Sequence, residues 1–288
     1  MRYLRLPLGP VEILLCLPRS SRRDATDKNA QALVMENARA QSIDGADVSP
    51  ELAELRERVH NIEWYHSIDL GHGLVTPGAF DLRPHLHQYP IPERMDGMRV
   101  LDVATFDGFW AFEFERRGAA EVIALDIDNF GDLDMSPRLR RTKSPEFLAR
   151  KTGEGFRLCH EALNSKVERR VMNIYDLSPD KLGKFDMVFL SDLLLHLHSP
   201  TRALENLYNV TSGQAFITDV VFPSLPGRMM HYEGGVGHNF WWRISLGALK
   251  QMIDDAGFEQ VELRNQFVLT HNGQKRPRYH HAAFVATP

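Results

Sequence analysis

From about Arg99 to the end of the chain, short apolar runs alternate with helical stretches, and this pattern constrains the fold more than any other feature of the sequence. Each run is dense in residues that suit a strand buried on both faces. Short buried strands separated by helices are typical of βαβ units and a parallel sheet. The runs are Arg99–Val103, Glu121–Asp126, Arg170–Ile174, Phe185–Leu190 and Ala215–Val221.

Helices are predicted at Phe109–Arg117, Pro200–Tyr208 and Leu246–Asp255, and glycines follow the first and third of them, as is common just past a helix end. The tail alternates as two more strands, Gln260–Leu269 and His280–Ala286, with a turn at His271–Gln274. The sequence therefore predicts an α/β fold: a doubly wound, seven-stranded, mostly parallel sheet with an antiparallel last strand.

The chain is predicted to have three parts. Residues 1–48 are expected to form a mobile extension, because their second half is polar and small. Their apolar run ends at Pro18 and contains Glu12, which argues against a signal peptide. Residues 49–98 begin with apolar side chains at helical spacing, which predicts a helical N-terminal segment with Asp47 or Ser49 as its cap. Residues 99–288 form the main domain, with an insert at 222–244 over the site.

Composition indicates the cellular location and the partner class of the protein, but it does not indicate the oligomeric state. Cys16 and Cys159 lie far apart, so we expect no disulfide framework and a reducing, cytoplasmic location. No apolar stretch approaches the roughly 20 residues that cross a bilayer, so no membrane span is expected. A net charge of -4 argues against nucleic-acid binding through bulk positive potential.

The loop after the first predicted strand is the first candidate site, because ligands of such sheets bind at the carboxyl ends of the strands. Asp102 lies near the strand end, and Gly108 opens the next helix. Ala104 and Phe106 occupy the first two glycine positions of a dinucleotide motif, so a pyrophosphate could not approach as closely. Asp126 ends the second strand, where a carboxylate can accept both ribose hydroxyls. Alternatively, both acids only cap strand ends.

Val100–Gly108 followed by Val122–Ile127 resembles the first two motifs of class I S-adenosylmethionine-dependent methyltransferases, which have a Rossmann-like fold. Four linked motifs resemble the tRNA wobble-uridine methyltransferase-like family more closely, whose best-known member uses a carboxylated form of that cofactor. They are Trp64–Gly71, Leu101–Gly118, Asn173–Pro179 and Leu194–Pro200.

This resemblance implies that S-adenosylmethionine binds with Asp102 at its ammonium group, Asp126 at the ribose, and Asn173 at the adenine edge. The full set implied is Trp64, Asp102, Ala104, Thr105, Phe106, Gly108, Asp126, Ile127, Asn173, Ile174 and Ser191. By the same resemblance, the extra carboxylate of the modified cofactor would meet His66, Leu195 and His281. A leucine cannot donate a hydrogen bond, so plain methyl transfer is favoured over carboxymethyl transfer.

The sequence motifs indicate less specifically which residues bind and activate the acceptor. The candidate catalytic residues are His196, Asp192, His238 and His66, since histidine and carboxylate side chains can remove a proton from an acceptor. The aromatic insert predicts an acceptor-binding lid, although its rings could merely pack. Its proposed contacts are Tyr232, His238, Phe240, Trp241, Trp242 and Arg243. No metal site is expected, because the paired histidines lack accompanying ligands at a typical spacing.

The predicted function is S-adenosylmethionine-dependent methyl transfer to a small molecule or to a tRNA wobble uridine. A basic stretch, Arg138–Lys143, could meet phosphates or be a solvated helix face. Three alternatives stay open: carboxymethyl transfer to tRNA, nicotinamide-dependent oxidoreduction, and a non-catalytic cofactor-binding module.

Overall fold

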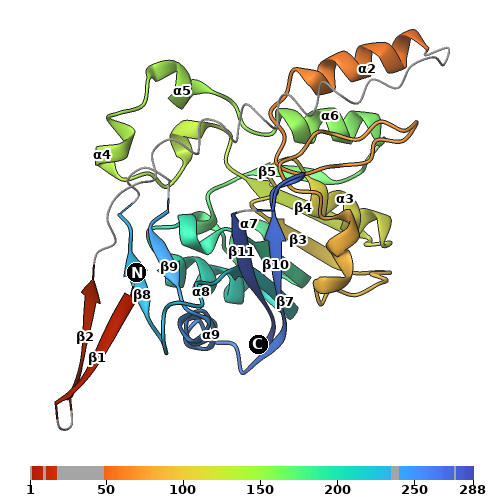
Figure 1. The fold of residues 1–288 in the computed structure, drawn as a ribbon. Coiled ribbons are helices and arrows are strands. Elements are labelled where there is room, and N and C mark those ends of the chain that lie inside the picture. Colours follow the sequence, from red (N-terminus) through yellow and green to blue (C-terminus); the bar gives the residue numbers. More distant parts are fainter. Residues whose placement is uncertain (1, 9–10, 18–48, 235–239, 276) are drawn as a thin grey trace. The chain divides into compact units, whose positions relative to one another are not determined.

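The computed structural model describes residues 2–8, 11–17, 49–234, 240–275 and 277–288, and it divides the chain into two units (Figure 1). The first unit, residues 1–46, contains an antiparallel hairpin of β1 (Arg2–Leu8) and β2 (Val11–Leu17). The prediction of a mobile extension over residues 1–48 stays a prediction, because most of that range lies outside the described residues. The second unit, residues 47–288, carries everything discussed below.

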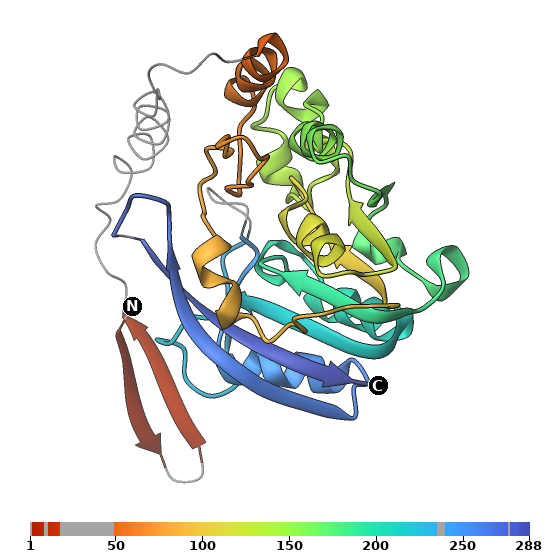
Figure 2. The same ribbon diagram turned by 90° about the vertical axis from the view of Figure 1, so that its right-hand side faces the viewer.

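The centre of the second unit is a seven-stranded sheet in the order β10-β11-β7-β6-β3-β4-β5 (Figures 1 and 2). The strands from β3 to β7 pair in parallel, whereas β11 is antiparallel to both of its neighbours. The predicted fold class is therefore confirmed. The strands are β3 (Arg99–Val103), β4 (Glu121–Asp126), β5 (Glu168–Val171), β6 (Phe185–Ser191), β7 (Thr211–Val220), β10 (Gln260–Thr270) and β11 (Arg278–Thr287).

Helices cover both faces of this sheet. The longer ones are α2 (Pro50–His60), α3 (Phe109–Arg116), α6 (Glu154–Ala162), α8 (Pro200–Val210) and α9 (Leu246–Asp255). Shorter helical segments are η1 (Arg83–Gln88), η2 (Phe130–Asp132), α4 (Pro137–Arg140), α5 (Pro145–Ala149), η3 (Ile174–Asp176), α7 (Pro179–Leu182) and η4 (Leu194–His196). Ser49 caps α2 by accepting a hydrogen bond from the Leu52 N–H, which decides between the two predicted caps.

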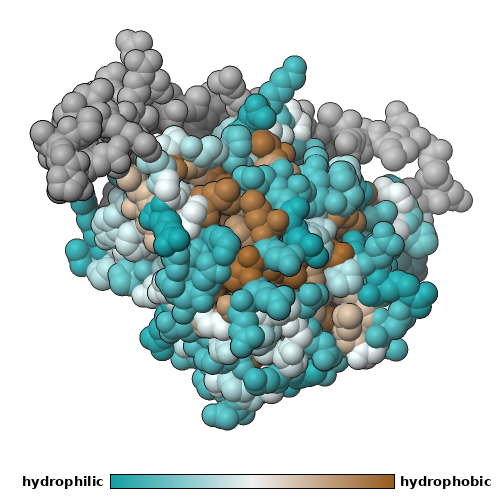
Figure 3. Space-filling view, turned by 90° about the horizontal axis from the view of Figure 1, so that it is seen from below, coloured by the Kyte–Doolittle hydropathy of each residue, from teal (hydrophilic) through white to brown (hydrophobic). Residues whose placement is uncertain are grey.

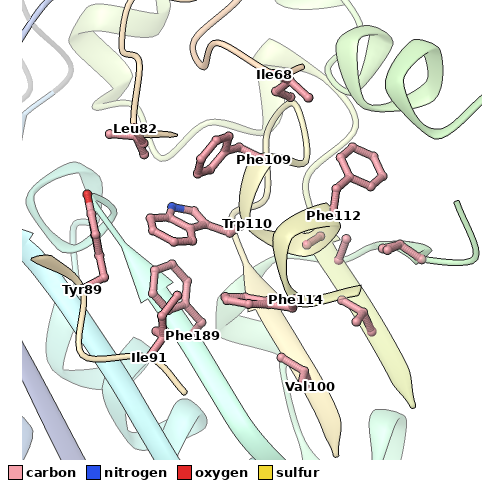
Figure 4. Packing of buried hydrophobic residues seen from close by; sticks show 14 of the residues in the cluster. Ile68, Leu82, Tyr89, Ile91, Val100, Phe109, Trp110, Phe112, Phe114 and Phe189 are labelled. Carbon is pink, nitrogen blue, oxygen red and sulfur yellow. The ribbon is translucent and has the colours of Figure 1, made fainter. Parts of the chain in front are cut away.

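Two apolar clusters, one on each face, hold the sheet between its helices. Alternate residues of β6 supply them: Met187 and Phe189 pack with α3, whereas Val188 and Leu190 pack with α8 and α9. The first cluster is rich in aromatic rings, and within it Trp110 packs against both Tyr89 and Phe189 (Figure 4). This packing fixes the carboxyl ends of the strands, where the site lies.

The face seen in Figure 3 is mainly polar, with apolar side chains gathered near its centre. Within the part of the chain that the structure describes, no helix has the length and apolarity that crossing a membrane requires.

Two regions differ from the sequence-based expectation. β5 runs from Glu168 to Val171, whereas the predicted strand runs from Arg170 to Ile174. The strand ends early because Asn173 caps η3 by accepting a hydrogen bond from the Tyr175 N–H. The insert at 222–244 contains a second small sheet, formed by β8 (Met230–Tyr232) and β9 (Trp242–Ile244).

Candidate functional site

The turn between β3 and α3 is held in a left-handed conformation by residues that are not glycine. Ala104 has φ 62° and Phe106 has φ 49°. The Ala104 N–H donates to the carbonyl of Leu125 at 2.8 Å, and the Phe106 N–H donates to Asp126 Oδ2 at 2.7 Å. These bonds to β4 compensate the strain of a left-handed alanine and phenylalanine. The chain therefore keeps the sharp turn without the glycines that usually provide it.

Asp102 and Asp126 are buried at the ends of adjacent strands, β3 and β4. Burial raises the pKa of Asp102 to about 7 and that of Asp126 to about 6. Asp126 accepts hydrogen bonds from the N–H groups of Phe106 and Ile127, both at 2.7 Å. Oδ2 of Asp102 is buried and has no hydrogen-bond partner among the described residues. A buried carboxylate oxygen left unpaired is costly, and such groups are typical of ligand sites.

A cavity of about 280 Å³ opens at the carboxyl ends of β3, β4, β5 and β6. Its position on both sides of β3 is the switch point of the sheet, where the chain order reverses. Most of the residues predicted to bind the cofactor line it: Asp102, Ala104, Phe106, Asp126, Ile127, Asn173, Ile174 and Ser191. Tyr65 and His66 line it from the N-terminal segment.

Three residues predicted to bind the cofactor do not line this cavity. Trp64 is buried elsewhere, and its indole N–H donates to the carbonyl of Val59. Thr105 is buried as well. Gly108 opens α3 with φ 91°, and a Cβ there would come within 2.4 Å of the Phe112 ring. Its small size therefore serves helix packing, which the sequence pattern could not distinguish from ligand approach.

The lining is strongly acidic. Besides Asp102 and Asp126, it contains Asp132, Asp134 and Asp192, whereas no lysine or arginine of the described residues lines it. Asp134 is already engaged, because Oδ2 accepts hydrogen bonds from the Tyr175 hydroxyl and the His198 N–H, both at 2.7 Å. The field in such a cavity favours cationic or neutral ligands over anions.

His66 is fixed by Asp107, a residue for which sequence reasoning assigned no role. Nδ1 of His66 lies 2.5 Å from Asp107 Oδ1, and both side chains are buried. Oδ2 of Asp107 also accepts hydrogen bonds from the N–H groups of Tyr65 and His66. Asp107 directly precedes Gly108 at the start of α3, and a carboxylate next to a motif glycine is the only signal the sequence offered.

Asp192 and His281 form a second buried pair. Nε2 of His281 donates to Asp192 Oδ1 at 2.9 Å, and Nδ1 donates to the carbonyl of Tyr279 at 3.1 Å. Burial alone would lower the pKa of His281 and raise that of Asp192, but the attraction between them reverses both shifts. Burial also raises the pKa of neighbouring Asp219 to about 7. Asp192 lines the cavity with φ 54°.

Of the other predicted catalytic residues, His196 lines the cavity, and its ring lies 5.0 Å from that of Phe240. His238 lies outside the described residues. Of the predicted acceptor-binding residues of the insert, those that the structure describes do not line the cavity. Trp241 is buried and donates its indole N–H to the carbonyl of Asp134, and Trp242 donates to that of His198.

Tyr232 and Arg243, two further predicted contacts of the insert, also do not line the cavity. Tyr232 is exposed, and Arg243 forms an ion pair with Glu233. The indole groups of Trp241 and Trp242 therefore contact the segments around Asp134 and His198.

Comparisons with known proteins bear on the family and the fold. A family model described as a methyltransferase domain matches residues 79–263. No curated protein sequence matches the chain. The structure of the N-terminal domain of EvdMO1 in the presence of SAH and D-fucose has a TM-score of 0.53 and 17% identity, over 84% of this chain and 99% of that domain.

The structure of EvdMO1 itself gives a TM-score of 0.52 and 14% identity. The match covers 85% of this chain but 49% of EvdMO1, so this chain spans about half the length of that protein. At these identities, the likenesses show the fold.

The matched family decides among the functional classes that the sequence left open. It favours neither a nicotinamide-dependent oxidoreductase nor a non-catalytic module, because it is a family of methyltransferases. It gives no support to the narrower resemblance to tRNA wobble-uridine enzymes. The cavity at the switch point, the two buried acids and the match over more than half of the chain lead to one conclusion: this chain belongs to the class I S-adenosylmethionine-dependent methyltransferases.

Proposed function

We propose that this methyltransferase transfers a methyl group to a neutral or cationic small molecule that binds in the acidic cavity. The observation that carries this proposal is the lining itself, with five aspartates and no lysine or arginine among the described residues. An anionic acceptor, or a cofactor with an extra carboxylate, would be repelled there, whereas a sulfonium cation would be attracted.

The residues of the cavity fit S-adenosylmethionine. We assign Asp126 to the ribose hydroxyls and the unpaired Oδ2 of Asp102 to the ammonium group. Ile127 and Ile174 would pack on the adenine faces. Oδ1 of Asn173 accepts the Tyr175 N–H, which leaves its amide N–H groups to donate to the adenine edge. The bound cofactor supplies an electrophilic methyl group on a positively charged sulfur.

Carboxymethyl transfer is the weaker candidate. Of the three positions that would meet the extra carboxylate, Leu195 is buried and does not line the cavity. His66 and His281 are already paired with Asp107 and Asp192. Neither histidine therefore offers an uncompensated positive charge to another carboxylate.

A small acceptor is favoured over tRNA for the same electrostatic reason. A tRNA would bring phosphates towards an acidic opening, and nucleic-acid affinity depends mainly on cationic contacts to phosphates. D-fucose, present with SAH in the EvdMO1 domain structure, is a neutral molecule with several hydroxyl groups. An acceptor of that chemical kind is compatible with the lining described above.

The test is a mass-shift screen. The full chain is incubated with methyl-labelled S-adenosylmethionine and, in separate reactions, with a metabolite extract and with total tRNA. We expect a labelled methyl group on a neutral or cationic metabolite, and no label from a variant with Asp126→Ala. Labelled tRNA, or a carboxymethyl gain on tRNA when the carboxylated cofactor is supplied, would overturn the proposal.

A further inference from the structure

The pair formed by His66 and Asp107 has the geometry of a base held in one protonation form. Asp107 is 2% exposed and His66 is 7% exposed, so their contact is shielded from water. Nδ1 of His66 faces Asp107 Oδ1, and the carboxylate can only accept, so Nδ1 carries the proton. The neutral ring then has its lone pair on Nε2. No hydrogen bond to Nε2 is found among the described residues, and His66 lines the cavity.

The surrounding structure fixes the ring as well as its proton. Thr76 Oγ1 donates to the carbonyl of His66 at 2.7 Å, which anchors the backbone on its other side. The imidazole stacks on Phe109 with ring centres 5.3 Å apart, and Phe109 itself packs beside Trp110 in the core (Figure 4). A Cβ at Gly78 would come within 2.0 Å of the His66 carbonyl carbon, so the following segment lies directly against it. A side chain held this firmly has little mobility left for binding to remove.

We propose that His66 is the general base of this methyltransferase, that Asp107 is its positioning residue, and that the acceptor atom is the oxygen of an alcohol. This inference rests on the proposed function and adds the acceptor atom to it. A neutral amine or a thiolate can attack a methyl sulfonium without losing a proton first. An alcohol is a poor nucleophile until its proton leaves, so a dedicated base serves it best.

The step balances within the cavity. Nε2 of His66 takes the proton of the hydroxyl group while the hydroxyl oxygen forms its bond to the methyl carbon. The carbon–sulfur bond breaks, its electron pair stays on sulfur, and sulfur loses its positive charge. His66 becomes an imidazolium that Asp107 stabilises, and the proton leaves to solvent after the methyl ether is released.

Asp107→Asn is the variant that tests the position of the His66 proton most directly. Its amide oxygen can still accept the N–H groups of Tyr65 and His66, while its NH₂ group would face Nδ1 of His66. His66 would then carry its proton on Nε2 and could not act as a base. His66→Gln removes the base altogether. Exposed residues supply matched controls, Asp180→Asn and His60→Gln, and His196→Gln tests the other histidine that lines the cavity.

The first measurement needs no acceptor. Nitrogen-15 NMR of histidine-labelled full chain, saturated with S-adenosylhomocysteine, reports which ring nitrogen is protonated, and His66→Gln identifies the signals. We expect a proton on Nδ1 in the wild type and on Nε2 in Asp107→Asn. A wild-type His66 protonated on Nε2 would overturn the inference, whatever the acceptor proves to be.

The second measurement uses the metabolite extract and labelled cofactor. We expect labelled methyl ethers from the wild type and both controls, and about 10² to 10⁴-fold slower formation by Asp107→Asn and His66→Gln, with unchanged S-adenosylhomocysteine affinity. Products methylated on nitrogen, or a loss confined to His196→Gln, would refute the role of His66. If the wild type labels nothing, the proposed function fails, whereas the NMR result still decides the protonation of His66.

Discussion

At the scale of single residues, the site is defined by carboxylates that are costly to bury. Asp102 and Asp126 have pKa values of about 7 and 6 in the folded chain, against 3.8 for the ordinary carboxyl group, because burial disfavours their charge. At pH values between the ordinary pKa of 3.8 and the raised pKa values, the folded state binds more protons than the unfolded state. The free energy of unfolding therefore falls as the pH rises from about 4 to about 7. A cationic ligand offsets this cost by pairing with the ionised forms.

Asp102→Asn is expected to separate stability from binding. The neutral side chain removes one buried charge, so the variant should unfold at higher denaturant concentration than the wild type at pH 8, with a smaller difference at pH 5. Its affinity for S-adenosylhomocysteine should fall by about 10 to 100-fold, the size of one charge-assisted hydrogen bond. Chemical unfolding and calorimetric titration at both pH values check this. Equal affinities in variant and wild type would remove Asp102 from the cofactor site.

A related pH dependence is expected for the wild type. As Asp102 and Asp126 lose their protons, the cavity becomes more negative and its attraction for a cation grows. The affinity for the positively charged S-adenosylmethionine should therefore increase from pH 5.5 to pH 8. Titration of the cofactor across this range measures it, with the neutral-sulfur product S-adenosylhomocysteine as a comparison that should change less.

At the scale of elements, the segment from β3 to α3 joins the binding turn to the core. Its turn is strained at Ala104 and Phe106 but not at Gly108, where the left-handed conformation suits glycine. Gly108 is required for packing as well, since a Cβ there would meet the rings of Phe112 and Phe156 at 2.4 and 2.7 Å. Glycine therefore suits the backbone at both ends of this short turn, but only position 108 has it.

Ala104→Gly and Gly108→Ala test this difference. The first relieves a left-handed alanine and should raise the free energy of unfolding by up to about 1 kcal/mol. The second adds a strained, crowded methyl group and should lower it by about 1–3 kcal/mol. Thermal or chemical unfolding gives both signs. A destabilising Ala104→Gly would show that the hydrogen bonds to β4 already remove the strain.

At the scale of the whole molecule, residues far apart in sequence meet at the cavity. Asp192 follows β6 and His281 lies on β11, yet their side chains form a buried pair. The pKa of Asp192 is held below its usual range and that of His281 above it. The pair therefore stabilises the fold above the unfolded pKa of the aspartate and below the raised pKa of the histidine, and its contribution is lost at higher pH.

A double-mutant cycle with Asp192→Asn and His281→Gln measures this link between two ends of the sheet. Each single change leaves one buried charged group without its partner and should cost about 3–5 kcal/mol at pH 6. The double variant should cost clearly less than the sum, and the coupling should shrink as rising pH removes the proton of His281. Additive losses at pH 6 would mean that the pair contributes no interaction energy.

The sequence by itself determined the sheet and much of the cavity. Strands buried on both faces must be apolar throughout, so β3, β4, β6 and β7 were visible as apolar runs. The carboxyl ends of parallel strands lie at one edge, so Asp102, Asp126 and Asn173 were placed near one another without coordinates.

Only the tertiary structure decided which side chains face the cavity. Trp64 and Gly108, which were predicted to bind the cofactor, serve the core instead, and the tryptophans of the insert pack instead of lining the cavity. Asp107 lies at the site because α3 begins beside the segment that contains His66, some forty residues earlier in the chain. Sequence spacing reports neighbours along one element, whereas pairs such as Asp107–His66 and Asp192–His281 arise from how separate elements pack, which no local pattern encodes.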